Sequence, residues 1–159
     1  MSVGEAALKG ALAGVAGGAA MMLARPLEAK GLLPASERSG PEWERIVRSE
    51  ARRRRIHLTE LQITLLGSAV HLSYSALIGA AYGVVRSRTR VPDAAQGLVT
   101  SALVYAANFP AVGLVPRRGI APPPKKQRPR KALTPVATHA VFGVTTAAAF
   151  RALAHGRLP

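Results

Sequence analysis

Apolar residues along this chain are gathered into long uninterrupted runs. Three stretches, 61–85, 94–115 and 132–150, contain no Asp, Glu, Lys or Arg. As α-helices, which rise about 1.5 Å per residue, they would measure roughly 37, 33 and 28 Å. The hydrocarbon core of a bilayer is about 30 Å thick, so runs of this length predict transmembrane helices.

A fourth apolar run lies near the N-terminus and carries a single charge, Lys9. A lysine near the end of a membrane helix can extend its ammonium group to the interface. A small soluble domain needs helices with one polar face, and these runs offer almost none. The pattern therefore predicts an all-α fold, a single membrane domain over residues 1–159 with four transmembrane helices. We expect these at about 6–24, 61–85, 94–115 and 132–151.

The segments between the runs hold nearly all the charge, and they differ in character. Pro41 is a typical first residue of a helix, and Trp43, Ile46 and Val47 are spaced to share one face. Residues 41–60 are therefore expected to form an amphipathic helix lying along the membrane interface, with Trp43 at headgroup level. Its basic run, Arg52, Arg53, Arg54 and Arg55, is expected to contact lipid headgroups. Residues 116–131 are read as a basic, Pro-rich loop.

The charges also predict an orientation. The formal net charge is +14, which in a soluble protein would suggest a nucleic-acid partner. Here sixteen of the 22 cations lie in the two long loops and six lie on the other side of the predicted helices. By the positive-inside rule the long loops face the cytoplasm and both termini face away from it. We therefore expect the anionic surface of a bilayer as the partner, and no nucleic acid.

The chain reads as an internal duplication of a helical hairpin. His71-Leu-Ser-Tyr74-Ser75 matches His139-Ala-Val-Phe142-Gly143, and 79–82 matches 147–150 in the pattern [GA]-A-A-[YF]. Gly10 and Gly14 resemble Gly97 and Ser101, and Pro26 and Pro110 each precede a Gly-Leu-x-Pro exit from a helix. Such halves would be related by a pseudo-two-fold axis along the membrane normal.

Small residues recur every four positions along the predicted helices. Faces of this kind let helix backbones approach closely inside a bilayer, and they also suit association with a second copy or a larger complex. The residues expected to pack helices are Gly10, Gly14 and Gly18 in the first helix, Gly67, Ser75, Gly79 and Gly83 in the second, and Gly143 in the fourth.

These motifs resemble the YagU-like family of bacterial inner-membrane proteins. The resemblance rests on His71-x-x-Tyr74-Ser75 with Gly79-x-x-Tyr82-Gly83, on the segment 110–116, and on His139-x-x-Phe142-Gly143. It covers most of the chain in the order of its elements. The resemblance implies an integral location in the inner membrane, and no catalytic residue is carried over from it.

His71 and His139 are the strongly ionisable side chains inside the predicted spans, and such residues point to function. They are candidates for three roles: hydrogen-bonding between helices, transfer of a proton or binding of a transported ligand, and bis-His ligation of haem. Asn108, which precedes Phe109-Pro110, is a further polar candidate that can cap carbonyls freed by the proline. Two histidines without a carboxylate make a poor metal site, so neither a metal nor a cofactor is predicted.

The sequence contains no cysteine, no nucleophile motif and no Gly-rich phosphate loop, which argues against an enzyme. The leading hypothesis is a non-enzymatic inner-membrane component that self-associates or serves as an accessory subunit. The alternatives are a small transporter or proton-responsive protein that uses His71 and His139, and a bis-His haem carrier in the membrane.

Overall fold

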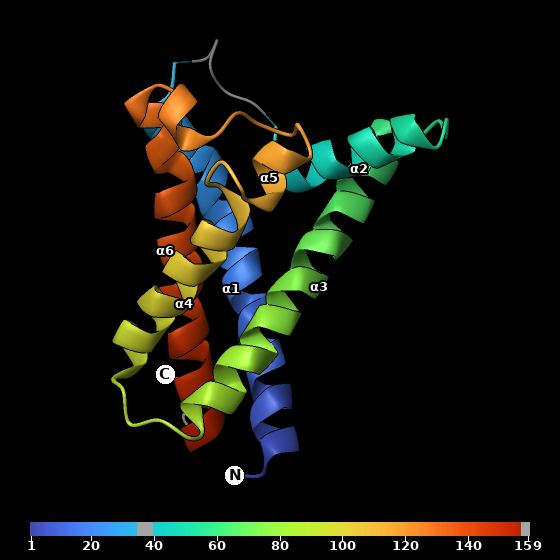
Figure 1. Ribbon diagram of the computed structural model, residues 1–159. Helices are drawn as coiled ribbons and strands as arrows, with labels where there is room; N and C mark the ends of the chain where they lie inside the picture. Colours follow the sequence, from blue (N-terminus) through green and yellow to red (C-terminus); the bar gives the residue numbers. More distant parts are fainter. Residues whose placement is uncertain (35–39, 157–159) are drawn as a thin grey trace.

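The computed structural model describes residues 1–34 and 40–156, in which helices are joined by turns and loops and no strand is present. Three helices are long and apolar enough to cross a membrane: α1 (Val3–Leu32), α3 (Glu60–Arg86) and α6 (Pro129–His155). The other elements are α2 (Glu42–Arg53), α4 (Asp93–Asn108), the short α5 (Leu114–Arg117) and a 3-10 turn, η2 (Pro124–Lys126). Both termini lie at one end of the bundle, and α2 and α5 lie at the other (Figure 1).

The third predicted span, 94–115, is shorter than expected. α4 ends at Asn108 because Pro110 has no N–H to donate and its ring crowds the preceding turn. A turn over residues 109–113 follows, and then α5. With 16 residues, α4 measures about 24 Å, so it falls short of a bilayer core and the described residues hold three helices of spanning length.

Two predicted boundaries of the other helices are also wrong. α1 continues through Pro26 to Leu32 instead of ending near residue 24, since a proline removes only one hydrogen bond of a long helix. α6 begins at Pro129, inside the predicted loop 116–131, because proline is well suited to the first turn of a helix.

The helix predicted over 41–60 is shorter than expected. α2 ends at Arg53, and Arg55 then adopts a positive φ of 56° that turns the chain. Thr59 starts α3 with a capping box: its hydroxyl accepts from the Gln62 N–H at 3.3 Å, and the Gln62 amide oxygen accepts from the Thr59 N–H at 2.8 Å. These two bonds satisfy backbone N–H groups at the start of α3. Residues 54–59 therefore form a turn between α2 and α3, and the two helices run in different directions.

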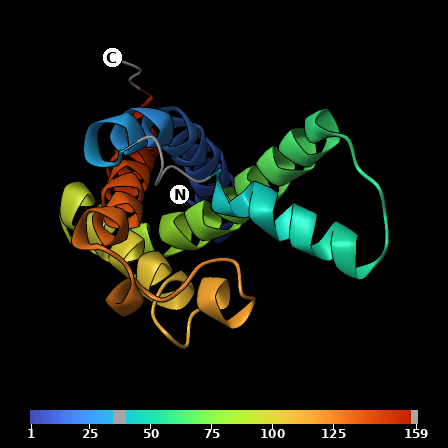
Figure 2. The same cartoon turned by 90° about the horizontal axis from the view of Figure 1, so that it is seen from above.

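The four longest helices pack in the spatial order α3, α1, α6, α4. α1 contacts α3 and α6 extensively, and α6 contacts α4, whereas α3 and α4 barely meet. α3 leans away from the other helices toward the end that carries α2, and α2 lies across that end (Figures 1 and 2). The bundle is therefore closed near the termini and open at the opposite end.

Glycine makes the closest helix contacts possible. A Cβ at Gly14 would lie 2.8 Å from the Gly79 Cα, and a Cβ at Gly10 would lie 2.9 Å from the Gly83 Cα. At the contact between α4 and α6, a Cβ at Gly97 would lie 3.0 Å from the Gly143 carbonyl carbon. Only helices without side chains at these points can approach so closely.

Large apolar side chains cover much of the outer surface. Leu23, Leu77 and Leu103 are each more than 60% exposed. In water such a surface would be unfavourable, whereas in a bilayer lipid chains cover it. The described fold thus matches the expectation of an all-α bundle whose outer face suits lipid.

Candidate functional site

A cavity of about 220 Å³ lies where α3 and α4 separate. α2 and α5 contribute to its wall at the open end of the bundle, and α1 and α6 form its floor. The lining is mostly apolar and aromatic, with a few polar side chains among them. The lining residues include Met21, Glu42, Trp43, His71, Tyr74, Ser75, Ile78, Val104, Asn108, Phe109, His139 and Phe142.

His71 reaches the cavity from α3 and is held on two sides. Its Nε2 atom lies 3.2 Å from the Gly18 carbonyl oxygen of α1, so Nε2–H donates to that oxygen and Nδ1 is left without the proton. Its ring stacks on the Trp43 indole with 4.2 Å between centroids. Gly67 leaves room for the indole, because a Cβ there would lie 3.0 Å from Trp43 Cδ1. His71 therefore joins α1, α2 and α3.

The Trp43 side chain, which the amphipathic pattern predicted at headgroup level, is covered by protein. It is 7% exposed and packs against His71 and Gly67 of α3. The apolar face of α2 thus packs on the protein instead of on lipid. The Arg25 guanidinium of α1 lies 5.9 Å from the indole centroid, which adds a cation–π contact.

His139 reaches the cavity from α6. Its Nδ1 atom lies 2.6 Å from the carbonyl oxygen of Pro135, one turn earlier in the same helix, so the proton is on Nδ1 and Nε2 carries the lone pair. Phe109, just after α4, and Tyr105 of α4 meet its ring edge to face, with centroids 5.4 and 6.0 Å away. The two histidines therefore line one cavity, and each ring packs against aromatic side chains.

Asn108 and Tyr74 close part of the gap between α4 and α3. The Asn108 Nδ2 group donates to the Tyr74 hydroxyl at 3.2 Å and to the Val104 carbonyl at 2.7 Å. Pro110 has no N–H to bond the carbonyl of Ala106, which is the carbonyl that the sequence suggested Asn108 would cap. The Asn108 side chain bonds the carbonyl of Val104 instead. Its position at the cavity wall makes it a cross-link where α3 and α4 separate; at their other end, Gln96 of α4 donates to the Tyr82 carbonyl of α3.

The sequence analysis missed Glu42, which lines the same cavity from α2. The Arg25 Nη2 atom donates to both of its carboxylate oxygens, at 2.9 and 3.0 Å, and the two side chains are 12% and 18% exposed. No spacing in the sequence links these residues. Arg25 directly follows the first apolar run, and Glu42 lies in the segment predicted as an interfacial helix.

A second, smaller cleft of about 40 Å³ adjoins the cavity and shares Met21, Glu42 and Phe109 with it. Half of its other polar side chains are cationic and half are neutral. They are Arg25 of α1, Arg45 of α2, Gln127 just after η2, and Lys131, Thr134 and Thr138 in the N-terminal part of α6. This cationic cleft lies at the end of the molecule that carries the two long basic loops.

The predicted packing glycines are used within the chain. Gly10, Gly14 and Gly18 face Ser75, Gly79 and Gly83 of α3. Gly143 faces Gly97 and Ser101 of α4, and Gly67 faces α2. The buried hydroxyls of Ser101 and Thr146 have no hydrogen-bond partner among the described residues. These faces are therefore occupied inside one molecule.

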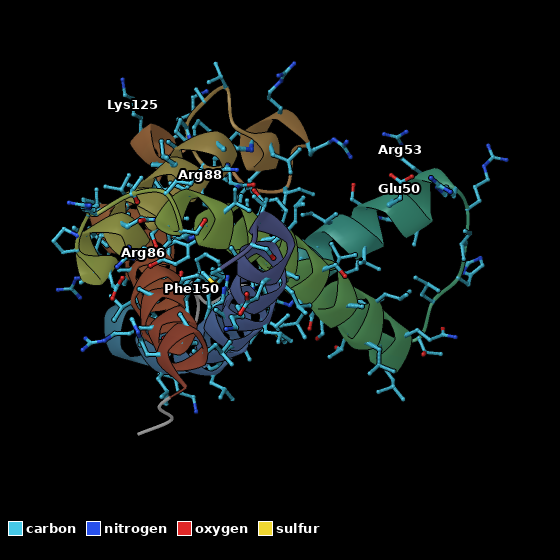
Figure 3. All side chains as sticks on the ribbon, turned by 90° about the horizontal axis from the view of Figure 1, so that it is seen from below. Glu50, Arg53, Arg86, Arg88, Lys125 and Phe150 are labelled. Carbon is cyan, nitrogen blue, oxygen red and sulfur yellow. The ribbon has the colours of Figure 1, made fainter. Side chains whose placement is uncertain are left out.

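The four arginines 52–55 lie apart from the cavity, exposed at the outer end of α2. Arg54 Nε donates to Glu50 at 2.6 Å, and Arg53 lies 3.8 Å from the same carboxylate (Figure 3). The bond from Arg54 lowers the pKa of the Glu50 carboxyl. This position leaves the run free to contact a charged surface.

The described residues contain no group of three His, Asp or Glu side chains placed to hold a metal ion. The cavity is also smaller than the roughly 300 Å³ at which pockets for drug-sized ligands begin, and both imidazole rings are stacked or wedged by aromatic neighbours. This geometry disfavours bis-His haem and suits a slender apolar ligand.

No protein-family model, curated protein or solved structure matches this chain.

Proposed function

We propose that this protein is a non-enzymatic component of a bacterial inner membrane that takes up a small apolar molecule from the bilayer. The ligand would lie in the cavity between α3 and α4, against His71 and His139. The proposal rests on one observation: α3 and α4 separate at one end of the bundle, and the space between them has a mostly apolar lining. A transport or proton-responsive role, the first alternative from the sequence, would use the same two histidines.

The proposal includes four membrane crossings with both termini on the periplasmic side. α1, α3 and α6 have the required length. α4 would cross together with residues 109–113 and α5, a segment in which Phe109, Gly113 and Val115 are buried against the bundle. The placement of both termini at one end supports an even number of crossings (Figure 1).

A duplicated hairpin is also part of the proposal. Ser75 lies between Gly14 and Gly18, and Gly143 lies between Gly97 and Ser101, so the close contact of one half has a counterpart in the other. This register aligns Gly14 with Gly97, one turn away from the alignment that the sequence suggested. Tyr82 and Phe150, the last positions of the repeated motif, touch edge to face with centroids 5.6 Å apart. We propose kinship with the YagU-like family on the same motif residues.

Self-association, the leading hypothesis from the sequence, was based on exposed faces of small residues, and these faces are covered. Its glycine faces pack α1 on α3 and α4 on α6 within one molecule. A homo-oligomer or a larger membrane complex would therefore have to form through the exposed leucine-rich surface. The cavity is the more specific feature, and the proposed function rests on it.

Trp43, the one tryptophan of the chain, offers a direct test because its indole lines the cavity. The probe is ω-bromoundecanol, whose bromine quenches indole fluorescence on contact. In detergent-solubilised protein we expect saturable quenching of Trp43. Val104→Phe fills the cavity and should abolish the saturable part, whereas Leu103→Phe, on the exposed side of the same helix, should retain it. Linear quenching that is equal in all three proteins would overturn the proposal.

A further inference from the structure

We propose that the occupant of the cavity is a single-chain amphiphile with an anionic head, a carboxylate or a phosphate. Its apolar chain would lie in the cavity, and its head in the adjoining cationic cleft. This inference rests on the proposed function and adds the chemical class of the ligand. It comes from the arrangement of the two hollows and from the charges that line the smaller one.

The two hollows adjoin one another. Met21, Glu42 and Phe109 line both, so the same three side chains would contact the chain and the head of a ligand that occupied the two hollows. The larger hollow has an apolar and aromatic lining, and the smaller one is lined by Arg25, Arg45 and Lys131. An apolar compartment that adjoins a cationic one matches the two ends of an anionic amphiphile.

The charge of the cleft is not balanced by its own carboxylate. Glu42 is bonded to Arg25 through both oxygens, so these two charges offset one another. Arg45 and Lys131 line the same cleft, and neither forms an ion pair with another described residue within salt-bridge distance. Both are half-buried, where charge-assisted hydrogen bonds to an anion are stronger than at a fully exposed site.

The volumes of the two hollows favour a slender ligand. The cavity of about 220 Å³ suits one apolar chain better than a two-chain lipid or a flat macrocycle. The cleft of about 40 Å³ has room for roughly three water molecules, which is the size of a carboxylate or a phosphate group. A head at this point would lie at the start of α6, at the end of the molecule that carries the basic loops.

Three bromine-labelled probes with the same chain test the inference through Trp43 quenching: ω-bromoundecanol, ω-bromoundecanoate and ω-bromoundecyl phosphate. We expect at least one anionic probe to bind about tenfold more tightly than the alcohol, a difference of about 1.4 kcal/mol. The better of the two anions identifies the head as carboxylate or phosphate, and either result supports an anionic ligand.

The variant Arg45→Gln/Lys131→Gln should remove this preference and leave the affinity for the alcohol unchanged, which also shows that the cavity is intact. The matched control is Lys125→Gln/Lys126→Gln, which removes the same charge from η2 outside the cleft; Lys125 projects away from the bundle (Figure 3). The control should keep the tenfold preference.

The outcomes separate the two proposals. If the alcohol and both anions bind saturably with equal affinity, the anionic head is wrong and the apolar cavity stands. If the anions bind more tightly but the cleft variant does not change that, the head does not lie in the cleft and the inference is overturned. If no probe gives saturable quenching, the proposed function itself fails.

Discussion

Adding one methyl group at Gly79 should separate α1 from α3. A Cβ at this position would lie 2.5 Å from the Gly14 Cα and 2.7 Å from the Gly14 nitrogen. Non-bonded carbon atoms are most stable about 3.5 to 4.0 Å apart, so the two backbones would have to move apart by about 1 Å. These obstacles are main-chain atoms, which cannot rotate away as the tip of a side chain can.

The magnitude follows from two opposing effects. Overpacking of this kind costs about 1 to 3 kcal/mol, and we expect the upper part of that range because backbone meets backbone. Alanine is favoured over glycine in a helix by about 1 kcal/mol. Gly79→Ala should therefore destabilise the protein by about 1 to 2 kcal/mol, which lowers the melting midpoint in detergent by roughly 2 to 8 °C. Gly79→Leu should be more damaging.

Two controls complete the measurement. Gly4→Ala makes the same chemical change in α1 where nothing lies within 4 Å of the new Cβ, so stability should stay equal or rise. Leu77→Ala truncates a side chain that is 67% exposed, and detergent or lipid fills the space it leaves. Equal melting midpoints for Gly79→Ala and Gly4→Ala, or a larger loss for Leu77→Ala than for Gly79→Leu, would refute the packing of α1 on α3 through Gly79.

Three further predictions address the membrane and the contact of α2 with the bundle. High-salt or alkaline washing should leave the protein in the membrane pellet, because apolar helices and not surface charge hold it there; recovery in the supernatant would contradict a spanning protein. The distribution of cations predicts that a reporter fused after residue 159 lies in the periplasm, so a reporter that works only there should be active. Activity of a reporter that works only in the cytoplasm would contradict this orientation. Glu42→Gln breaks a charge-assisted bond to Arg25 and should cost about 1.5 to 3 kcal/mol, with Trp43 emission shifting to longer wavelength as α2 loosens; Glu50→Gln, at an exposed pair, should leave the emission unchanged.

The sequence by itself determined which segments are helical and apolar. Runs without charge over 61–85 and 132–150 leave little choice but helices that avoid water, and α3 and α6 cover both runs. Length alone could not place the end of 94–115, where Pro110 stops α4. Thr59-x-x-Gln62 is a capping-box sequence, which by itself specifies the start of α3.

Only the tertiary structure decided what covers each face. The pattern of Trp43, Ile46 and Val47 specifies that α2 has an apolar face, but amphipathicity does not distinguish lipid from protein as its cover. Packing on α3 decides it, because Gly67 leaves space for the Trp43 indole.

The cavity is a still clearer case. A duplicated sequence predicts equal contacts in both halves, so α3 should meet α4 as α1 meets α6, and it does not. One element outside the repeated motifs, α2, occupies the end where α3 and α4 separate and has no counterpart in the second half. For this reason the histidines could be identified in the sequence as candidates, while Glu42, the cationic cleft and the room between α3 and α4 required the fold.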